Sequence, residues 1–207
     1  NKRRIACLKS QPNGLGPATE ALAKFVDVFP TDCESWLELA ALYQAQNKCA
    51  YVWQHAYQQN SQALFALEEL LLLSPQNGYY LLEYAETLYT AGEFAKAYKI
   101  YLRILELGNG NLAPNSADYE DRTRGPWVRT LWGLKMDDTV LMQLTTVHRA
   151  NAWIAAKGKS SDDQVVAKDV QAIDELVTKL LLTSVYAPGP QEPPASTRAA
   201  ARAVLSA

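Results

Sequence analysis

The sequence predicts an all-α protein built from repeated pairs of antiparallel helices. Residues 78–111 have the pattern of two amphipathic helices joined by a tight turn. A related pattern precedes them, at residues 33–77. Hydrophobic residues make up 48% of the chain and charged residues 20%, which is typical of a folded rather than a disordered protein.

The pair at residues 78–111 has the best-defined helices. The first is expected at Tyr79–Ala91 and ends at Gly92, which tolerates a positive φ. The second is expected at Phe94–Leu107 and ends at Gly108. The apolar residues of the first helix recur at steps of three and four, which places them on one face: Leu81, Tyr84, Ala85 and Leu88.

The order of residue sizes in this pair is more specific than its periodicity. Small Ala85 is followed by small Ala97, and the bulky Tyr101 lies one turn further on. Two antiparallel helices approach closely only where both side chains are small, and bulky neighbours then fix the crossing. This order, in a unit of about 34 residues, is typical of tetratricopeptide (TPR) repeats. We therefore expect TPR-like helical hairpins that form a right-handed α-solenoid.

Residues 33–77 form a second such unit. Asp32 is expected to cap its first helix, which carries Trp36, Leu39, Ala40 and Tyr43 in the same order of sizes. The second helix is expected to end before Pro75. Because Trp36 and Pro75 lie roughly eleven residues further apart than the repeat predicts, residues 47–60 are interpreted as an insert. The insert either lengthens one helix or forms a loop between the two.

The remaining elements complete the predicted domain organisation. A first unit at 1–32 has short helices on either side of the turn Pro12-Asn13-Gly14. Residues 112–125 are polar and are expected to form a loop. Degenerate helices follow at 126–183: Pro126–Met136, Asp138–Ala156 and Asp163–Leu182. The solenoid thus covers 1–183, and a Pro-rich tail covers 184–207. Within the tail, Thr197–Leu205 is expected to form a short helix if it packs against another surface.

The sequence contains no recognisable catalytic motif. The only two histidines, His55 and His148, belong to no catalytic motif, and no phosphate-binding loop occurs. The three cysteines lack metal-ligand spacing. We expect a protein that is not an enzyme and needs no cofactor or metal.

Charge argues against nucleic-acid binding, and hydropathy argues against a membrane-spanning helix. The net charge of −2 gives no basic field for nucleic acid. The longest apolar runs, such as Leu70–Leu73, are far shorter than a membrane-spanning helix. The local basic cluster Lys2-Arg3-Arg4 is interpreted as a solvated helix start, with acidic lipid heads or an acidic partner as the alternative.

A candidate partner-binding groove follows from the repeat. In stacked helical pairs, the first helices line the concave side. The groove looks apolar and suits an apolar helix or extended segment. Some TPR co-chaperones clamp a C-terminal carboxylate here with Lys and Asn, whereas Leu37, Ala41, Leu82 and Glu86 stand where those polar residues would be needed. The expected groove residues are Leu37, Ala41, Gln44, Tyr79, Leu82, Glu86 and Tyr89.

Several segments resemble one particular family in the same order along the chain. They are Lys2–Ala6, Trp36–Ala40, Leu67–Leu70, Tyr84–Thr90 and Arg129–Leu134. The most specific are Leu-Glu-Glu-Leu at 67–70 and Arg-Thr-Leu-Trp-Gly-Leu at 129–134. With these segments the chain resembles the family of subunit 2 of the endoplasmic reticulum (ER) membrane protein complex, in its fungal version.

The resemblance implies a cytosolic, peripheral scaffold subunit of a hetero-oligomeric membrane insertase. That complex inserts tail-anchored and multi-pass proteins into the ER membrane, and the subunit would hold cytosolic parts of its membrane-embedded subunits. The alternative is a free-standing TPR adaptor or co-chaperone that binds a partner peptide in its concave groove. A third hypothesis is an enzyme with a helical-repeat fold, as in prenyltransferase α-subunits. No catalytic group in the sequence supports it.

Overall fold

The computed structural model describes residues 2–49, 53–108, 127–136, 170–186 and 195–205, and in these ranges the only regular structure is helical. The chain divides into two compact units, Asn1–Glu93 and Phe94–Ala207, and each is described by itself. This architecture confirms the predicted all-α class of TPR-like helical pairs.

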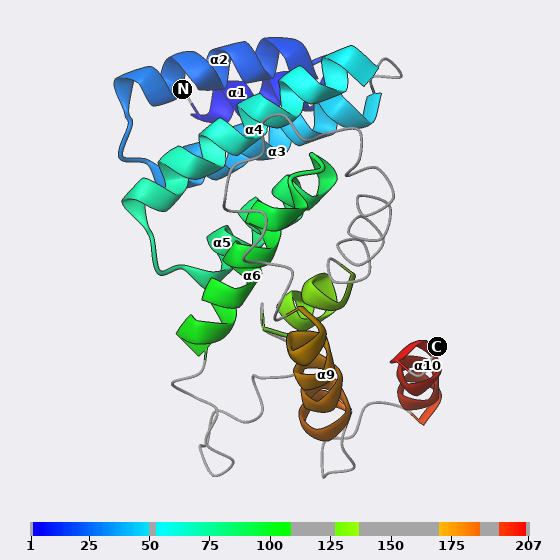
Figure 1. Ribbon diagram of the computed structural model, residues 1–207. Coiled ribbons are helices and arrows are strands. Elements are labelled where there is room, and N and C mark those ends of the chain that lie inside the picture. The colour runs from blue at the N-terminus through cyan, green and yellow to red at the C-terminus, as the bar shows by residue number, and fades with distance from the viewer. Residues whose placement is uncertain (1, 50–52, 109–126, 137–169, 187–194, 206–207) are drawn as a thin grey trace, which may run out of the picture. The chain divides into compact units, whose positions relative to one another are not determined.

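The first unit contains α1 (Lys2–Lys9), α2 (Leu15–Val28), α3 (Cys33–Cys49), α4 (Trp53–Leu73) and α5 (Gly78–Thr90). Each helix contacts the one that follows it in the sequence, as Figure 1 shows from blue to green. The pairs α1/α2 and α3/α4 correspond to the two predicted upstream units. Helix α5 is the first helix of the third predicted unit.

The turns between these helices follow the local sequence signals. Asn13 has a φ of 64°, and a Cβ atom at the neighbouring Gly14 would collide with the Leu8 carbonyl. Gly92 has a φ of 83° at the end of α5, as predicted. The Asn77 side chain caps α5 by accepting a hydrogen bond from Tyr79 N at 3.0 Å.

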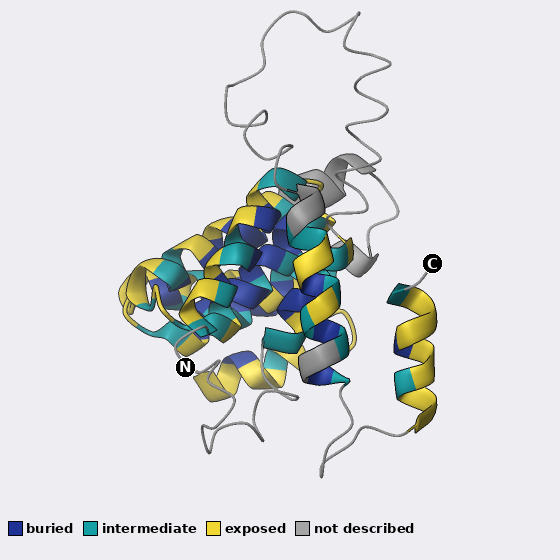
Figure 2. Ribbon diagram, turned by 60° about the horizontal axis from the view of Figure 1, so that its bottom comes forward, coloured by how far each residue is buried: buried dark blue, intermediate teal, exposed yellow. Residues whose placement is uncertain are grey.

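The core of the first unit consists mainly of the residues that the helical periodicity selects (Figure 2). Small Ala40 and Ala85 are completely covered, as the size pattern requires for close helix crossings. Tyr43 is only half-buried. The buried apolar side chains include Leu22, Val26, Trp36, Leu39, Leu42, Leu67, Leu70, Leu81 and Leu88.

Most residues of the expected insert at 47–60 belong to helices. Residues 47–49 end α3, which is 17 residues long, and residues 53–60 begin α4, which is 21 residues long. Both helices are therefore longer than an ordinary TPR helix, whereas the sequence suggested one longer helix or a loop. Residues 50–52 lie outside the described ranges.

The second unit contains α6 (Phe94–Gly108), a helix at 127–136, α9 (Val170–Leu180) and α10 (Ala195–Leu205). A π-helical turn, Leu181–Val185, extends α9 past the predicted domain end at 183. The expected loop at 112–125, the expected helix Asp138–Ala156 and the start of Asp163–Leu182 lie outside the described residues.

Three contacts connect the helices of the second unit. A Cβ atom at Gly133 would lie 2.7 Å from Tyr101 Cζ, so this glycine permits close packing on α6. Trp132 Nε1 donates a hydrogen bond to Tyr186 Oη at 3.2 Å. Lys135 Nζ lies 2.7 Å from Asp174 Oδ1 on α9. The helix at 127–136 is thereby fixed against both α6 and α9.

Candidate partner-binding surface

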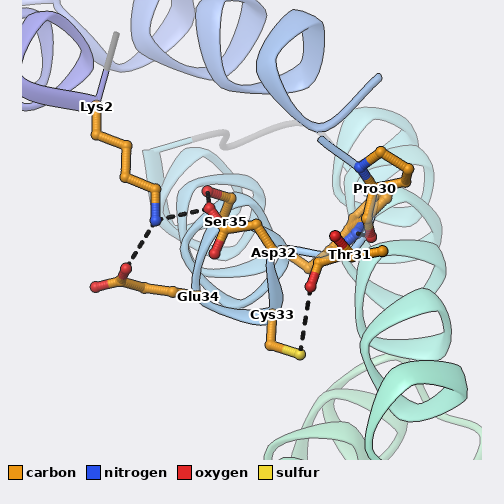
Figure 3. A network of polar contacts seen from close by, with 8 residues as sticks. Lys2, Pro30, Thr31, Asp32, Cys33, Glu34 and Ser35 are labelled. Atoms are coloured by element: carbon orange, nitrogen blue, oxygen red, sulfur yellow. Dashed lines mark hydrogen bonds and ion pairs between the residues drawn. The ribbon is translucent and has the colours of Figure 1, made fainter. Parts of the chain in front are cut away.

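The first helices of the repeats, α1 and α3, are joined by charged side chains. Lys2 Nζ lies 2.6 Å from Asp32 Oδ2 and 2.8 Å from Glu34 Oε2 (Figure 3). Further along the same two helices, Lys9 Nζ lies 3.3 Å from Glu38 Oε1. The hydrogen bond from Lys2, and then that from Ser35, hold the pKa of the Asp32 carboxyl below its usual value.

A buried polar contact joins α3 to α5. Gln44 Nε2 donates a hydrogen bond to Thr87 Oγ1 at 2.8 Å, and Thr87 Oγ1 donates to the Glu83 carbonyl at 2.7 Å. Thr87 is buried, so both of its partners satisfy a hydroxyl that water does not reach. Helices α1, α3 and α5 therefore lie next to one another. The outward-facing side of these three helices is called here the α1/α3/α5 surface.

The structure places the predicted groove residues in three different environments. Tyr79 is 61% exposed and Ala41 is exposed, so both side chains are available to a partner. Leu37, Gln44, Glu86 and Tyr89 are half-buried. The amide of Gln44 is used by Thr87, so this residue positions α5 against α3.

Leu82 was expected on the groove but is only 1% exposed and belongs to the core. Helix α5 contacts α4 on one side and α3 on another, so it buries a wider face than a single apolar stripe. The buried residues of α5 are Leu81, Leu82, Tyr84, Ala85, Thr87 and Leu88. The prediction for Leu82 is corrected accordingly.

The structure adds Glu83 to this surface. Glu83 lies four residues after Tyr79 and three before Glu86, so the three side chains share one face of α5. Residues 33–93 contain seven glutamates and a single cationic side chain, Lys48. Charge counted by segment, rather than over the whole chain, would have revealed this acidic character from the sequence.

The exposed groups of this surface are of kinds that take part in protein recognition. Within the described ranges, no three His, Cys, Asp or Glu side chains gather closely enough to hold a metal ion. Among the helices that the structure describes, none combines the length and apolar character needed to cross a membrane. The surface offers an exposed aromatic ring, small apolar residues and carboxylates, which are groups that recognise a protein segment.

Comparisons with known proteins agree with this fold. The family model of the EMC2 TPR-like repeat domain matches residues 1–101. ER membrane protein complex subunit 2 of Xenopus tropicalis and subunit 2-A of Xenopus laevis are each 34% identical to the chain over 114 residues. These matches cover 54% of the chain and 34% of each relative, so the chain spans about a third of the relatives' length.

Proposed function

We propose that the chain is a non-catalytic scaffold subunit of the ER membrane protein complex, because the family model of the EMC2 TPR-like repeat domain matches residues 1–101. In this role it lies peripherally on the cytoplasmic side of the ER membrane. It holds cytosolic parts of membrane-embedded subunits and so supports insertion of tail-anchored and multi-pass proteins. Its partners are proteins, and it works within a hetero-oligomer.

The placement of α1, α3 and α5 side by side supports the scaffold part of this proposal. The Lys2–Asp32 and Gln44–Thr87 contacts fix three successive first helices side by side. A partner segment that crosses this surface meets groups whose positions are already set, so little ordering of the scaffold opposes binding. Exposed Tyr79 provides the kind of aromatic anchor that contributes strongly at protein interfaces.

The charge of the surface favours a protein segment over other ligands. Glu83 and Glu86 face the same side of α5 as Tyr79, and carboxylates repel the phosphate backbone of a nucleic acid. They equally disfavour the acidic C-terminal peptides that TPR co-chaperones bind. A free-standing adaptor for such peptides is therefore the weaker alternative.

Affinity purification of the tagged chain from detergent-solubilised membranes tests the proposal. Stoichiometric co-elution of multi-pass ER proteins, identified by mass spectrometry, is the expected result. Recovery of soluble chaperones alone, or of no partner, contradicts it.

Two variants identify the surface that is responsible. Ala41→Arg places a bulky cation on exposed α3 and should abolish co-elution if this surface is used. Val28→Ser changes a residue on α2 that is 67% exposed and outside the surface, so it is the matched control. Equal loss in both variants would exclude a specific role for the α1/α3/α5 surface.

A further inference from the structure

A second exposed surface lies on α4, the second helix of its pair. Phe65 is 56% exposed and Leu72 is 76% exposed, although both are large apolar side chains. They are seven residues apart, so they lie about 10 Å apart along the helix and within about 20° around its axis. Phe65 and Leu72 therefore form one apolar stripe, called here the α4 stripe.

The Phe65 ring is held in place by its contact with Trp36. It packs edge-on against the buried Trp36 ring, with 6.3 Å between the ring centroids and 77° between the planes. Trp36 is itself fixed, because its Nε1 donates a hydrogen bond to the Pro30 carbonyl at 2.8 Å. The exposed ring is thus preorganised, which reduces the entropy that a partner must overcome on binding.

Carboxylates flank the stripe on both sides. Glu68 and Glu69 lie about 60° and 40° from Phe65 in opposite directions around the helix. Glu68 accepts a hydrogen bond from Tyr84 Oη at 2.8 Å. Burial, together with this hydrogen bond, raises the pKa of the Tyr84 hydroxyl, which therefore remains a donor. No Lys or Arg occurs between Trp53 and Leu73, so nothing on α4 neutralises the two glutamates.

We propose that the α4 stripe docks an amphipathic helix of a partner protein that carries apolar residues at seven-residue spacing flanked by Lys or Arg. Apolar positions at this spacing allow two helices to pack side by side, and flanking charges select the partner. This site goes beyond the scaffold proposal, because α4 is a second helix and does not contribute to the α1/α3/α5 surface.

Charge excludes the other occupants of an apolar stripe. The cytoplasmic leaflet of a membrane is negative and repels Glu68 and Glu69, so the stripe is unsuited to lipid binding. A second copy of the chain, bound by two-fold symmetry, would bring the same glutamates of two molecules together. A cationic helix satisfies both the apolar and the acidic parts of the site.

The test measures binding of two synthetic helical peptides to the full chain by fluorescence anisotropy. Both peptides have about 20 residues and apolar residues at the same seven-residue spacing. The positions that flank the apolar residues are all Lys in the first peptide and all Glu in the second. We expect the Lys peptide to bind and the Glu peptide not to bind. Leu72→Ser should weaken binding at least about tenfold. Val28→Ser, at a similarly exposed site on α2, should not change it.

A charge reversal makes the test specific. Glu69→Lys should weaken the Lys peptide and allow the Glu peptide to bind. Equal affinity for the two peptides, no effect of Leu72→Ser, or absent binding of the Lys peptide overturns the proposal. Stronger binding to phosphatidylserine vesicles than to the Lys peptide, lost in Leu72→Ser, also overturns it in favour of a membrane. Circular dichroism confirms that each variant is folded.

Discussion

Gly133 lies directly against the Tyr101 ring, and a Cβ atom at this glycine would stand 2.7 Å from Tyr101 Cζ and 2.8 Å from Cε1. The two residues belong to different helices of the second unit. Gly133 belongs to the segment 129–134, one of the two most specific segments of the family resemblance. The close approach of Tyr101 gives a physical reason for a glycine at this position. Only a residue without a side chain allows the helix at 127–136 to approach α6 this closely.

Gly133→Ala should destabilise the chain by about 1–3 kcal/mol, because overpacking forces the Tyr101 ring or the backbone to move. Urea denaturation measures the change in the free energy of unfolding. Gly16→Ala is the control, since no atom lies within 4 Å of the added Cβ and alanine favours the helix. An equal effect of the two substitutions would show that packing on Tyr101 is not the cause.

Ala85→Leu should cost about 1–3 kcal/mol, since Ala85 is completely buried and the larger side chain overpacks the core. A fall in the melting temperature, measured by circular dichroism, is the expected result. Ala41→Leu makes the same chemical change on the exposed face of α3 and should stay within about 0.5 kcal/mol of the parent. An unchanged melting temperature for Ala85→Leu would mean that the repeat is wrongly phased.

The Lys2–Asp32 ion pair predicts a pH dependence of stability. The pKa of Asp32 is lower in the folded chain than in the unfolded one, chiefly through its hydrogen bond with Lys2. The pair therefore stabilises the fold above the unfolded pKa of about 4, and this stabilisation is lost as the pH falls through the folded value.

Lys2→Met should lower the urea midpoint at pH 7, and this difference from the parent should disappear as the pH falls below about 4. Arg3→Met removes a neighbouring exposed cation and is the control, for which we expect no such pH dependence. A Lys2→Met difference that stays constant down to pH 2 would rule out the pair as its source.

The contact between Lys135 and Asp174 predicts that substitutions of these two residues are strongly coupled in their effect on stability. The Lys135 ammonium bonds both carboxylate oxygens of Asp174, at 2.7 and 2.8 Å, and both side chains are largely buried. Lys135→Met should cost about 1.5–3 kcal/mol, because a partly buried carboxylate loses its charged partner.

A double-mutant cycle with Asp174→Leu isolates this interaction. The double variant Lys135→Met/Asp174→Leu should be more stable than Lys135→Met alone, since it no longer buries an unpaired charge. Additive losses from the two substitutions would show that the pair contributes no coupling energy.

Much of the candidate surface could be predicted from the repeat, and the failures have a definite cause. Helical phase placed Ala41 and Tyr79 on an exposed face, where the structure has them. It misplaced Leu82, because phase gives the direction of a side chain and not the number of helices that surround it. The insert shows the same limit, because a count of extra residues left open whether they extend helices or form a loop.

The sequence by itself determined most helices of the first unit, their turns and most of that unit's core. These depend on interactions between residues close in the chain, such as the three- and four-residue steps of α5 and the positive φ of Gly92. Only the tertiary structure decided which polar groups meet. Gln44 and Thr87 are 43 residues apart, and Lys135 and Asp174 are 39 apart. Such pairs form where helix packing brings two faces together, and no local periodicity encodes that distance.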